Sequence, residues 1–332
     1  MSTIIIAEAG INHNGSFILA KKLIQAAARA GADYVKFQTF ETKDMIKENT
    51  KLVKYQRGKI GKNLSQYNML KKYQLKKNLY KKLVLHASKN KIKLLSSPFD
   101  IGSIKFLKKF NFDFIKIPSG EINNFPYLRE IGKLNKKIIL STGMSSIKEV
   151  EAAIKILTKY GTNRKNITLL HCHSDYPSRP EDLNLNSILT LKKKFNLNVG
   201  FSDHSIGVEA PIISIVLGAK VIEKHLTLNN KLKGPDHKAS IEPNDFKKMV
   251  LAIRNAEKML GDGKKIASKN ESKIKRLVRK SIVAKKEIKK GEKFSEENLT
   301  TKRPGIGLSP MKFENLINMI AKRNYKKDDF IK

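Results

Sequence analysis

The stretch VGFSDHSIGVEAPIISIVLGAKVIEKH (residues 199–225) decides the fold class, because it shows one pattern twice. A short run rich in β-branched and apolar residues ends in polar, ionisable side chains, and a helical pattern leads to the next run. The first run ends at Asp203 and His204, and the second ends at Glu223 and His225. This alternation is typical of parallel strands that are connected by helices.

Six earlier runs of the same kind precede this stretch. They are IIIAEAG ending at Glu8, YVKFQ at Lys36 and Gln38, KLLSSP at Ser97, FIKIPSG at Lys116 and Ser119, KIILSTG at Ser141, and ITLLHCHS at His171 to Ser174. Eight strand–helix units predict an α/β protein built on a closed (β/α)8 TIM barrel, whose active site lies at the C-terminal ends of the strands. The polar residues would converge there, so the chain is an enzyme candidate.

The chain of 332 residues is long enough for one large domain and one small one. We expect the TIM barrel at residues 1–262, a polar linker at 263–279 and a small β-rich domain at 280–332. Alone, the small domain would bury little core, so we expect it to dock on another surface. A long excursion between Gln38 and Leu75 is either a flap over the barrel mouth or a surface insertion without function.

The formal net charge of +37 has two interpretations. It could be the basic footprint of a nucleic-acid-binding protein. The lysines, however, fall on the polar faces of nearly every predicted helix, which favours a general compositional bias over nucleic-acid binding. A positive field would still attract an anionic substrate.

Several features favour the cytoplasm. The sequence lacks an uncharged apolar run of about 18 residues, so we expect no membrane span. The first residues do not resemble a secretory signal, and the lone Cys172 cannot form an intrachain disulfide.

His204 and His225 end neighbouring strands, so their imidazoles could bind a divalent transition metal and leave positions for water and a substrate oxygen. Either histidine alone is more often a hydrogen-bonded structural residue. The pair, with Glu223 and Asp203 nearby, favours the metal site.

A second group of strand-end residues is cationic or hydroxylic. Ammonium and hydroxyl donors suit a phosphate or carboxylate group, and they are supplied by Lys36, Ser97, Lys116, Ser119 and Ser141. Other side chains suit sugar hydroxyls or an amide: Glu8, Gln38, Tyr176 and Asp236. Together the two groups predict a metal-activated carbonyl that is attacked by a carbon nucleophile carrying phosphate.

Nine segments closely resemble the sialic acid synthase family, which includes N-acetylneuraminate and N,N'-diacetyllegionaminate synthases. They are EAGINHNG (8–15), KFQTF (36–40), SSPF (96–99), KIPSGE (116–121), STGM (141–144), HCHSDYP (171–177), FSDHS (201–205), EKH (223–225) and GPDHKASIEP (234–243). The C-terminal segments RKSIVAKKEIKKGEKF and TTKRPG resemble the antifreeze-like SAF domain of these proteins.

The resemblance implies a transferase that condenses phosphoenolpyruvate with N-acetylmannosamine, or with its 2,4-diacetamido-2,4,6-trideoxy analogue, and releases phosphate. It implies that His204 and His225 bind the metal, typically Mn²⁺, with Mg²⁺ or Co²⁺ as alternatives. It assigns contacts with phosphoenolpyruvate to Lys36, Ser97, Lys116, Ser119, Ser141 and Ser174. It assigns the sugar and the reaction intermediate to Gln38 and Tyr176 and to three catalytic carboxylates, Glu8, Glu223 and Asp236.

The resemblance also implies a domain-swapped homodimer, in which Arg303 reaches the partner's site and holds the acetamido group of the sugar. Two residues depart from the family pattern: Ser97 stands where Thr is frequent, and Ser174 stands where some members have Asn. KFQTF and SQYNMLKK favour a legionaminate precursor as the sugar. The alternatives are a metal-dependent pyruvate aldolase and a basic nucleic-acid-binding protein with an inert barrel.

Overall fold

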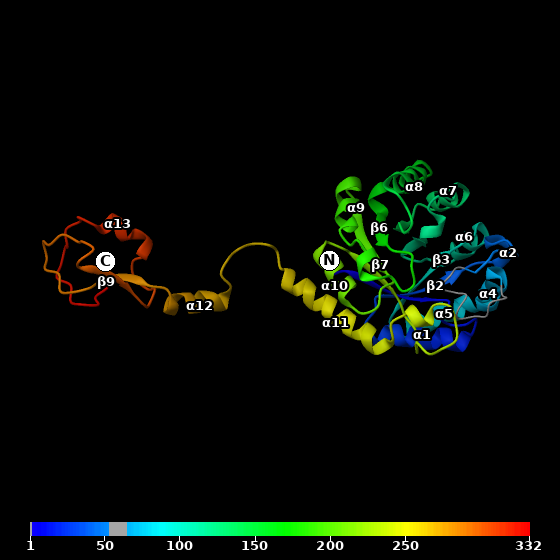
Figure 1. Cartoon of the computed structure of the whole chain (residues 1–332), viewed down its shortest axis with the longest axis horizontal. Coiled ribbons are helices and arrows are strands. Elements are labelled where there is room, and N and C mark those ends of the chain that lie inside the picture. The colour runs from blue at the N-terminus through cyan, green and yellow to red at the C-terminus, as the bar shows by residue number, and fades with distance from the viewer. Residues whose placement is uncertain (1, 53–64) are drawn as a thin grey trace. The chain divides into compact units, whose positions relative to one another are not determined.

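The computed structural model describes residues 2–52 and 65–332, and the chain divides into two compact units, residues 1–261 and 262–332. The first unit contains one parallel sheet with the strand order β3-β2-β1-β8-β7-β6-β5-β4, and the end strands β3 and β4 contact each other. The sheet therefore curls into the predicted barrel (Figure 1). Its strands are β1 (Ile4–Gly10), β2 (Tyr34–Thr39), β3 (Lys93–Pro98), β4 (Phe114–Ile117), β5 (Lys137–Ser141), β6 (Ile167–Cys172), β7 (Asn198–Asp203) and β8 (Val221–His225).

Helices surround the strands and pack their apolar faces on the outside of the barrel (Figure 1). Local sequence fixes where many of them begin. For example, Ser146 and Glu149 form a reciprocal capping box at the start of α8. The helices are α1 (Phe17–Arg29), α2 (Thr42–Met45), α4 (Gln66–Tyr73), α5 (Tyr80–Lys89), α6 (Ile101–Leu107), α7 (Phe125–Gly132), α8 (Ile147–Lys159), α9 (Ser187–Phe195), α10 (Glu209–Val216) and α11 (Pro243–Leu260).

The barrel interior changes from apolar to polar along the strands. One buried cluster fills its lower part, formed by Ile6, Tyr34, Leu95, Ile139, Leu170 and Val221. Because successive side chains of a strand point to opposite faces, the residue two positions further points into the barrel again. Five of the six next residues are polar, namely Glu8, Lys36, Ser97, Ser141 and Glu223, and the sixth is Cys172. A Cβ on Gly200 would lie 2.3 Å from the Val221 carbonyl oxygen, so this layer has no room for a larger residue there.

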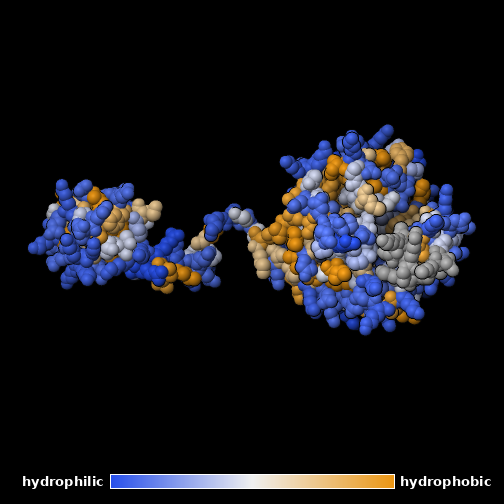
Figure 2. Space-filling model, viewed as in Figure 1, coloured by the Kyte–Doolittle hydropathy of each residue, from blue (hydrophilic) through white to orange (hydrophobic). Residues whose placement is uncertain are grey.

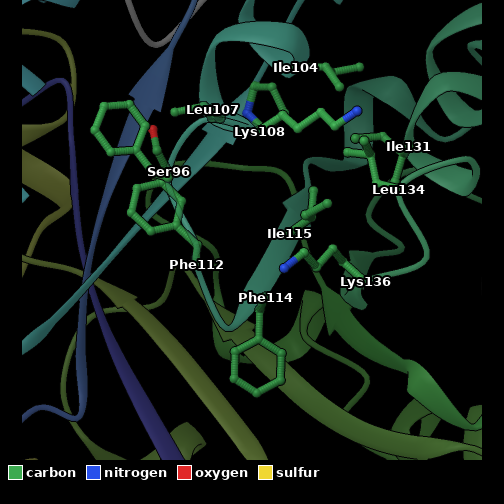
Figure 3. Close-up of a pocket in the computed structure, with 12 residues that line it drawn as sticks. Ser96, Ile104, Leu107, Lys108, Phe112, Phe114, Ile115, Ile131, Leu134 and Lys136 are labelled. Atoms are coloured by element: carbon green, nitrogen blue, oxygen red, sulfur yellow. The ribbon is translucent and has the colours of Figure 1, made fainter.

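A small apolar cavity of about 70 Å³ lies beside β3 and β4 (Figure 3). Phe110, Phe112 and Phe114 line it together with residues of α6 and α7. It is much smaller than the pockets that usually hold organic ligands.

The excursion between β2 and β3 carries the short helices α2 and α4. Its apolar side chains form a separate buried cluster with Ile11 from the loop after β1, and they are Phe40, Leu52, Met69, Leu70 and Tyr73. Residues 53–64 of the predicted flap lie outside the described residues.

The second unit has a small core of its own around Ile282, Phe294 and Tyr325. It contains α12 (Lys269–Val278), α13 (Phe313–Leu316) and the antiparallel strands β9 (Ser281–Ala284) and β10 (Leu299–Lys302). The stretch expected to be a polar linker thus contains a helix, which a capping box of Ser268 and Glu271 begins. Among the described residues, no helix has the length and apolarity needed to span a bilayer.

Candidate active site

A cavity of about 370 Å³ opens at the C-terminal ends of the strands. Every site residue that we predicted in the barrel lines it: Glu8, Lys36, Gln38, Ser97, Lys116, Ser119, Ser141, Ser174, Tyr176, His204, Glu223, His225 and Asp236. Arg303 is exposed and belongs to the second unit. The structure therefore brings the barrel residues to one place, as the strand-end pattern requires.

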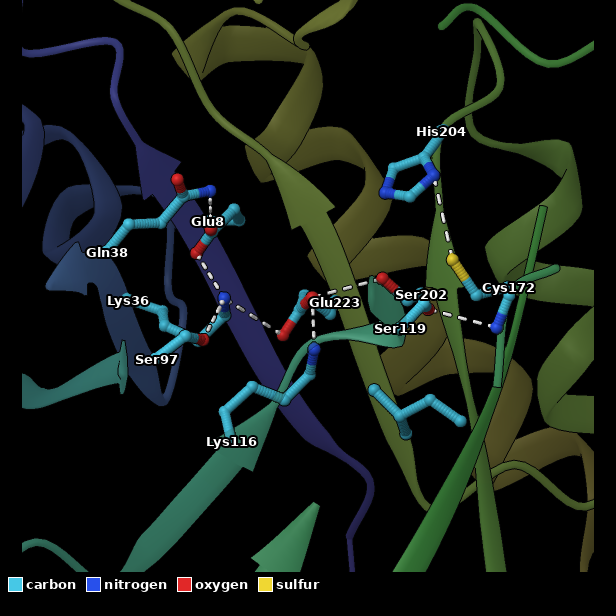
Figure 4. Close-up of polar contacts among 12 residues, drawn as sticks. Glu8, Lys36, Gln38, Ser97, Lys116, Ser119, Cys172, Ser202, His204 and Glu223 are labelled. Carbon is cyan, nitrogen blue, oxygen red and sulfur yellow. Dashed lines mark hydrogen bonds and ion pairs between the residues drawn. The ribbon is translucent and has the colours of Figure 1, made fainter. Parts of the chain in front are cut away.

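Four buried charges form the floor of this cavity (Figure 4). Lys36 Nζ lies 2.8 Å from Glu8 Oε2 and 3.7 Å from Glu223 Oε2, and Lys116 Nζ lies 3.3 Å from Glu223 Oε1. All four side chains are at most 5 % exposed. The two lysines thus pair with two carboxylates in one buried network.

The two carboxylates differ in pKa because their surroundings differ. Burial raises the pKa of Glu8 to about 7, against the attraction of Lys36. Burial also acts on Glu223, but Lys116 and Lys36 outweigh it and lower the pKa of Glu223 to about 2. Glu223 is therefore a permanent anion at neutral pH, whereas Glu8 can hold or release a proton. Two titratable groups whose pKa values are pushed apart in one site are typical of an acid–base centre.

Serine hydroxyls surround the lysines. Ser97 Oγ accepts a hydrogen bond from Lys36 at 3.0 Å, and Ser119 Oγ accepts one from the Gly143 amide at 2.9 Å. Ser141 Oγ is buried without a hydrogen-bond partner among the described residues. A Cβ on Gly143 would lie 2.4 Å from Ser174 Oγ, so this glycine leaves room for the hydroxyls to gather. The arrangement offers cationic and hydroxyl donors to an anion.

His204 presents one ring nitrogen to the cavity. Its Nδ1 lies 2.6 Å from the His173 carbonyl oxygen, which can only accept, so Nδ1 carries the proton. In the neutral form of the ring the lone pair is then on Nε2, which lies 2.9 Å from the Tyr176 hydroxyl. Burial opposes protonation, but Cys172 and the His173 carbonyl outweigh it and raise the pKa of His204, so a metal ion would compete with a proton for Nε2. A backbone carbonyl that fixes the tautomer in this way is a frequent partner of metal-binding histidines.

His225 is the second candidate metal ligand. Its ring centroid lies 5.4 Å from that of His204, and its Nδ1 is buried without a hydrogen-bond partner among the described residues. Burial and the positive charges nearby lower the pKa of His225 well below its usual value, so the ring is neutral. Two neighbouring imidazoles fit a transition-metal ion, which would displace the proton from His204. Within residues 2–52 and 65–332, no three His, Cys, Asp or Glu side chains group around one ion position, so water or substrate would complete the coordination.

Asp203 is close enough to His204 for its charge to raise the pKa of that ring, but its side chain does not line the cavity. Strand alternation turns Asp203 to the outside of the barrel, where it forms a buried ion pair with Lys224 and accepts hydrogen bonds from Ser205. The same alternation turns Ser202 inward. Ser202 donates a 3.0 Å hydrogen bond to Glu223, a site contact that our sequence reasoning missed although the residue lies in the FSDHS motif.

A second pair of histidines supports the loop that carries Asp236. His237 Nδ1 lies 2.7 Å from Thr227 Oγ1, and His237 Nε2 lies 3.2 Å from Asn14 Oδ1, so the ring connects the loops after β1 and β8. His13 is 1 % exposed beside it. Burial, together with His237, lowers the pKa of His13 to about 4. His13 is therefore a neutral structural group at physiological pH.

Comparisons with known proteins agree with this geometry. The NeuB family matches residues 23–265, and the SAF domain matches residues 279–332. The chain is 51% identical to the N,N'-diacetyllegionaminic acid synthase of Campylobacter jejuni over 330 residues, which cover 99% of both chains. The enzyme of that name from Legionella pneumophila is 42% identical, with 96% of this chain and 90% of that one covered.

A solved structure shares the fold. The crystal structure of N-acetylneuraminic acid (sialic acid) synthetase from Leptospira borgpetersenii, in complex with citrate, matches with a TM-score of 0.74 and 34% identity. The match covers 82% of this chain and 90% of that chain.

Proposed function

This chain belongs to the NeuB family, and on that premise we propose that it is a phosphoenolpyruvate-dependent nonulosonic acid synthase of the sialic acid type. It would condense phosphoenolpyruvate with an N-acetylated mannose-type sugar and release phosphate. The single observation that carries the proposal is the cavity floor, where two buried lysines and two carboxylates lie in one cavity with two imidazoles. The high identity to legionaminic acid synthases favours the 2,4-diacetamido-2,4,6-trideoxy sugar.

Phosphoenolpyruvate would bind on the floor. Its phosphate and carboxylate groups match the ammonium groups of Lys36 and Lys116 and the hydroxyls of Ser97, Ser119, Ser141 and Ser174. The free hydroxyl of Ser141 supports this position, because a buried donor without a partner is stabilised when a ligand supplies one.

The reaction forms one carbon–carbon bond. Carbon 3 of phosphoenolpyruvate attacks the sugar aldehyde, water adds at carbon 2, and phosphate leaves when the bond from carbon 2 to oxygen breaks. Glu8 has a pKa suited to transfer a proton during these steps. Glu223 would remain ionised and stabilise positive charge at carbon 2, while Gln38, Tyr176 and Asp236 would hold sugar hydroxyls.

A divalent metal fits the two imidazoles. His204 and His225 would hold it, with Mn²⁺ as the ion that we favour. When bound there, the ion would polarise the aldehyde oxygen as a Lewis acid.

The active unit would be a domain-swapped homodimer in the cytoplasm, in which the partner subunit's Arg303 completes the sugar site. Two observations support a contact between copies. The neighbouring helices α10 and α11 expose large apolar side chains, among them Val216 at 62 % and Leu251 at 55 %. Apolar patches also interrupt the mostly hydrophilic surface in Figure 2. Arg303 is exposed and therefore accessible to another subunit.

A phosphate-release assay tests the proposal. We expect release only when phosphoenolpyruvate and an acetamido sugar are both present, and we expect a chelator to abolish it. Condensation that uses pyruvate and releases no phosphate would instead identify the aldolase. If neither reaction occurs and the protein retains DNA or RNA in a salt-sensitive manner, the nucleic-acid-binding alternative is correct.

A further inference from the structure

The cavity has an apolar side that the chemistry above does not use. Five side chains form it, and we call them the apolar wall: Ile11, Met45, Leu70, Phe99 and Met144. They come from the loop after β1, from α2, from α4, and from the loops after β3 and β5. Because the anionic substrate would fill the polar floor, the sugar must lie between the floor and the mouth, where it meets this wall.

The wall is supported from behind. Ile11 and Leu70 belong to the buried apolar cluster of the excursion, against which Met45 and Phe99 pack. The Phe99 ring also meets the Phe40 ring edge to face, with 6.3 Å between their centroids. A surface held in this way is already formed before a ligand arrives, so little ordering would be needed on binding.

Met144 completes the wall on the other side of the mouth. It is 76 % exposed and has a φ of +61°, a conformation that an unbranched apolar residue seldom adopts. The loop is tied to the floor, because the preceding residue, Gly143, donates its amide to Ser119. A strained and exposed apolar side chain at the rim of a site suggests that it contacts a ligand there.

Gln66, in the first turn of α4, adds an amide beside the wall. An acetamido group combines a methyl group with an amide, so it matches an apolar surface next to Gln66. A sugar that carries only hydroxyls at these positions would lose hydrogen bonds to water on binding and would form fewer hydrogen bonds with this surface.

We propose that the apolar wall selects sugars whose remote substituents end in methyl groups, namely a 6-deoxy carbon and a second acetamido group, over N-acetylmannosamine. This inference rests on the proposed function and deepens it, because it assigns the choice of sugar to residues that make no contact with the reacting atoms. One methyl-sized group in an apolar pocket typically changes kcat/KM by roughly 10- to 200-fold.

The test compares kcat/KM for 2,4-diacetamido-2,4,6-trideoxymannose with kcat/KM for N-acetylmannosamine in the full-length protein. We expect the wild type to prefer the first sugar by at least about 10-fold. Met45→Gln and Met144→Gln should each lower that preference roughly 3- to 10-fold by raising KM for the diacetamido sugar, with KM for phosphoenolpyruvate unchanged. Met45→Leu should keep the preference, and so should Leu85→Gln, an apolar-to-glutamine change at a position on α5 that is 56 % exposed.

Two results would overturn the inference: a wild type that prefers N-acetylmannosamine, or an unchanged preference in both glutamine variants. If Met45→Gln fails to fold, the exposed Met144→Gln decides. Phosphate release from neither sugar would overturn the proposed function together with the inference. If both glutamine variants release phosphate as the wild type does and keep the wild-type preference between the two sugars, the inference alone is overturned.

Discussion

The barrel mouth and the C-terminal unit both carry many charges, but they hold them in opposite ways. In the mouth, Lys36 and Lys116 are each 3 % exposed and lie against buried carboxylates. In the C-terminal unit, Lys302 pairs with Asp328 while both side chains are about half exposed, and the basic residues of α12 are exposed to solvent. Buried charges are rare and costly, and the four in the mouth lie in the candidate site, whereas the exposed ones account for much of the net charge of +37.

The largest effect should come from a buried carboxylate of the mouth. Glu8→Gln keeps the shape of the side chain but removes its proton transfer, so we expect kcat for phosphate release to fall roughly 10²- to 10⁴-fold. Glu271→Gln changes an exposed carboxylate of the C-terminal unit in the same way and should leave kcat unaltered. Equal kcat values for the two variants would remove Glu8 from the chemistry. Circular dichroism should show that both variants are folded.

Mixed dimers test whether the two units cooperate between subunits. Glu8→Gln and Arg303→Ala should each be nearly inactive alone. Co-expression of the two variants should restore about a quarter of wild-type activity, because half of the dimers are mixed and one site in each combines an intact barrel with an intact Arg303. The absence of any recovery in purified mixed dimers would mean that Arg303 acts within its own subunit.

Buried and exposed ion pairs should differ in stability. Lys224→Met leaves the buried Asp203 carboxylate without its partner, so we expect a loss of about 3–5 kcal/mol in the free energy of unfolding. Lys302→Met breaks the exposed pair with Asp328 and should lose about 0–1 kcal/mol. Urea denaturation measures both values. The double variant Lys224→Met/Asp203→Leu should recover much of the loss, and if it does not, the penalty lies in packing and not in an unpaired charge.

The smallest effect concerns pH. His13 has a pKa of about 4 in the folded barrel and of about 6.5 when unfolded, so between these values the unfolded chain binds more protons. Stability should therefore fall as the pH is lowered from 6.5 to 4. At pH 4.5 the protonation of His13 in the unfolded chain should lower the free energy of unfolding by roughly 2–3 kcal/mol relative to pH 7. Urea denaturation at pH 7 and pH 4.5 should show a smaller difference in His13→Gln than in the wild type, and identical differences would contradict the assignment.

The strand ends allowed much of the site to be predicted. Period-two alternation and the barrel rule place Glu8, Lys36, Lys116 and His225 in one cavity without any long-range information. The same alternation explains why the Asp203 side chain does not line the cavity. Asp203 lies one position from His204 and therefore faces the outside of the barrel. We had placed it near the pair because it also ends the run, although alternation within the strand excludes neighbours from sharing a face.

Other features could not be predicted from local pattern. The apolar wall joins Ile11, Leu70 and Phe99, which are distant in sequence and meet only through tertiary packing. Helix α12 is mostly polar, and we overlooked two signals in it: the capping box of Ser268 and Glu271, and the helical spacing of Ile274, Leu277 and Val278. Ser202 is a small hydroxyl in a strand, and its contact with Glu223 depends on the register of β7 against β8.

The apolar plug formed by Ile6, Leu95, Leu170 and their neighbours closes the barrel beneath the polar layer. Within the described part of the barrel, substrates and products can therefore enter and leave the cavity only through the mouth. A substrate that binds on the polar floor must therefore enter before the substrate that binds above it. It cannot leave while that second substrate remains bound. We therefore expect a compulsory order of addition, with the enol phosphate first and the sugar second.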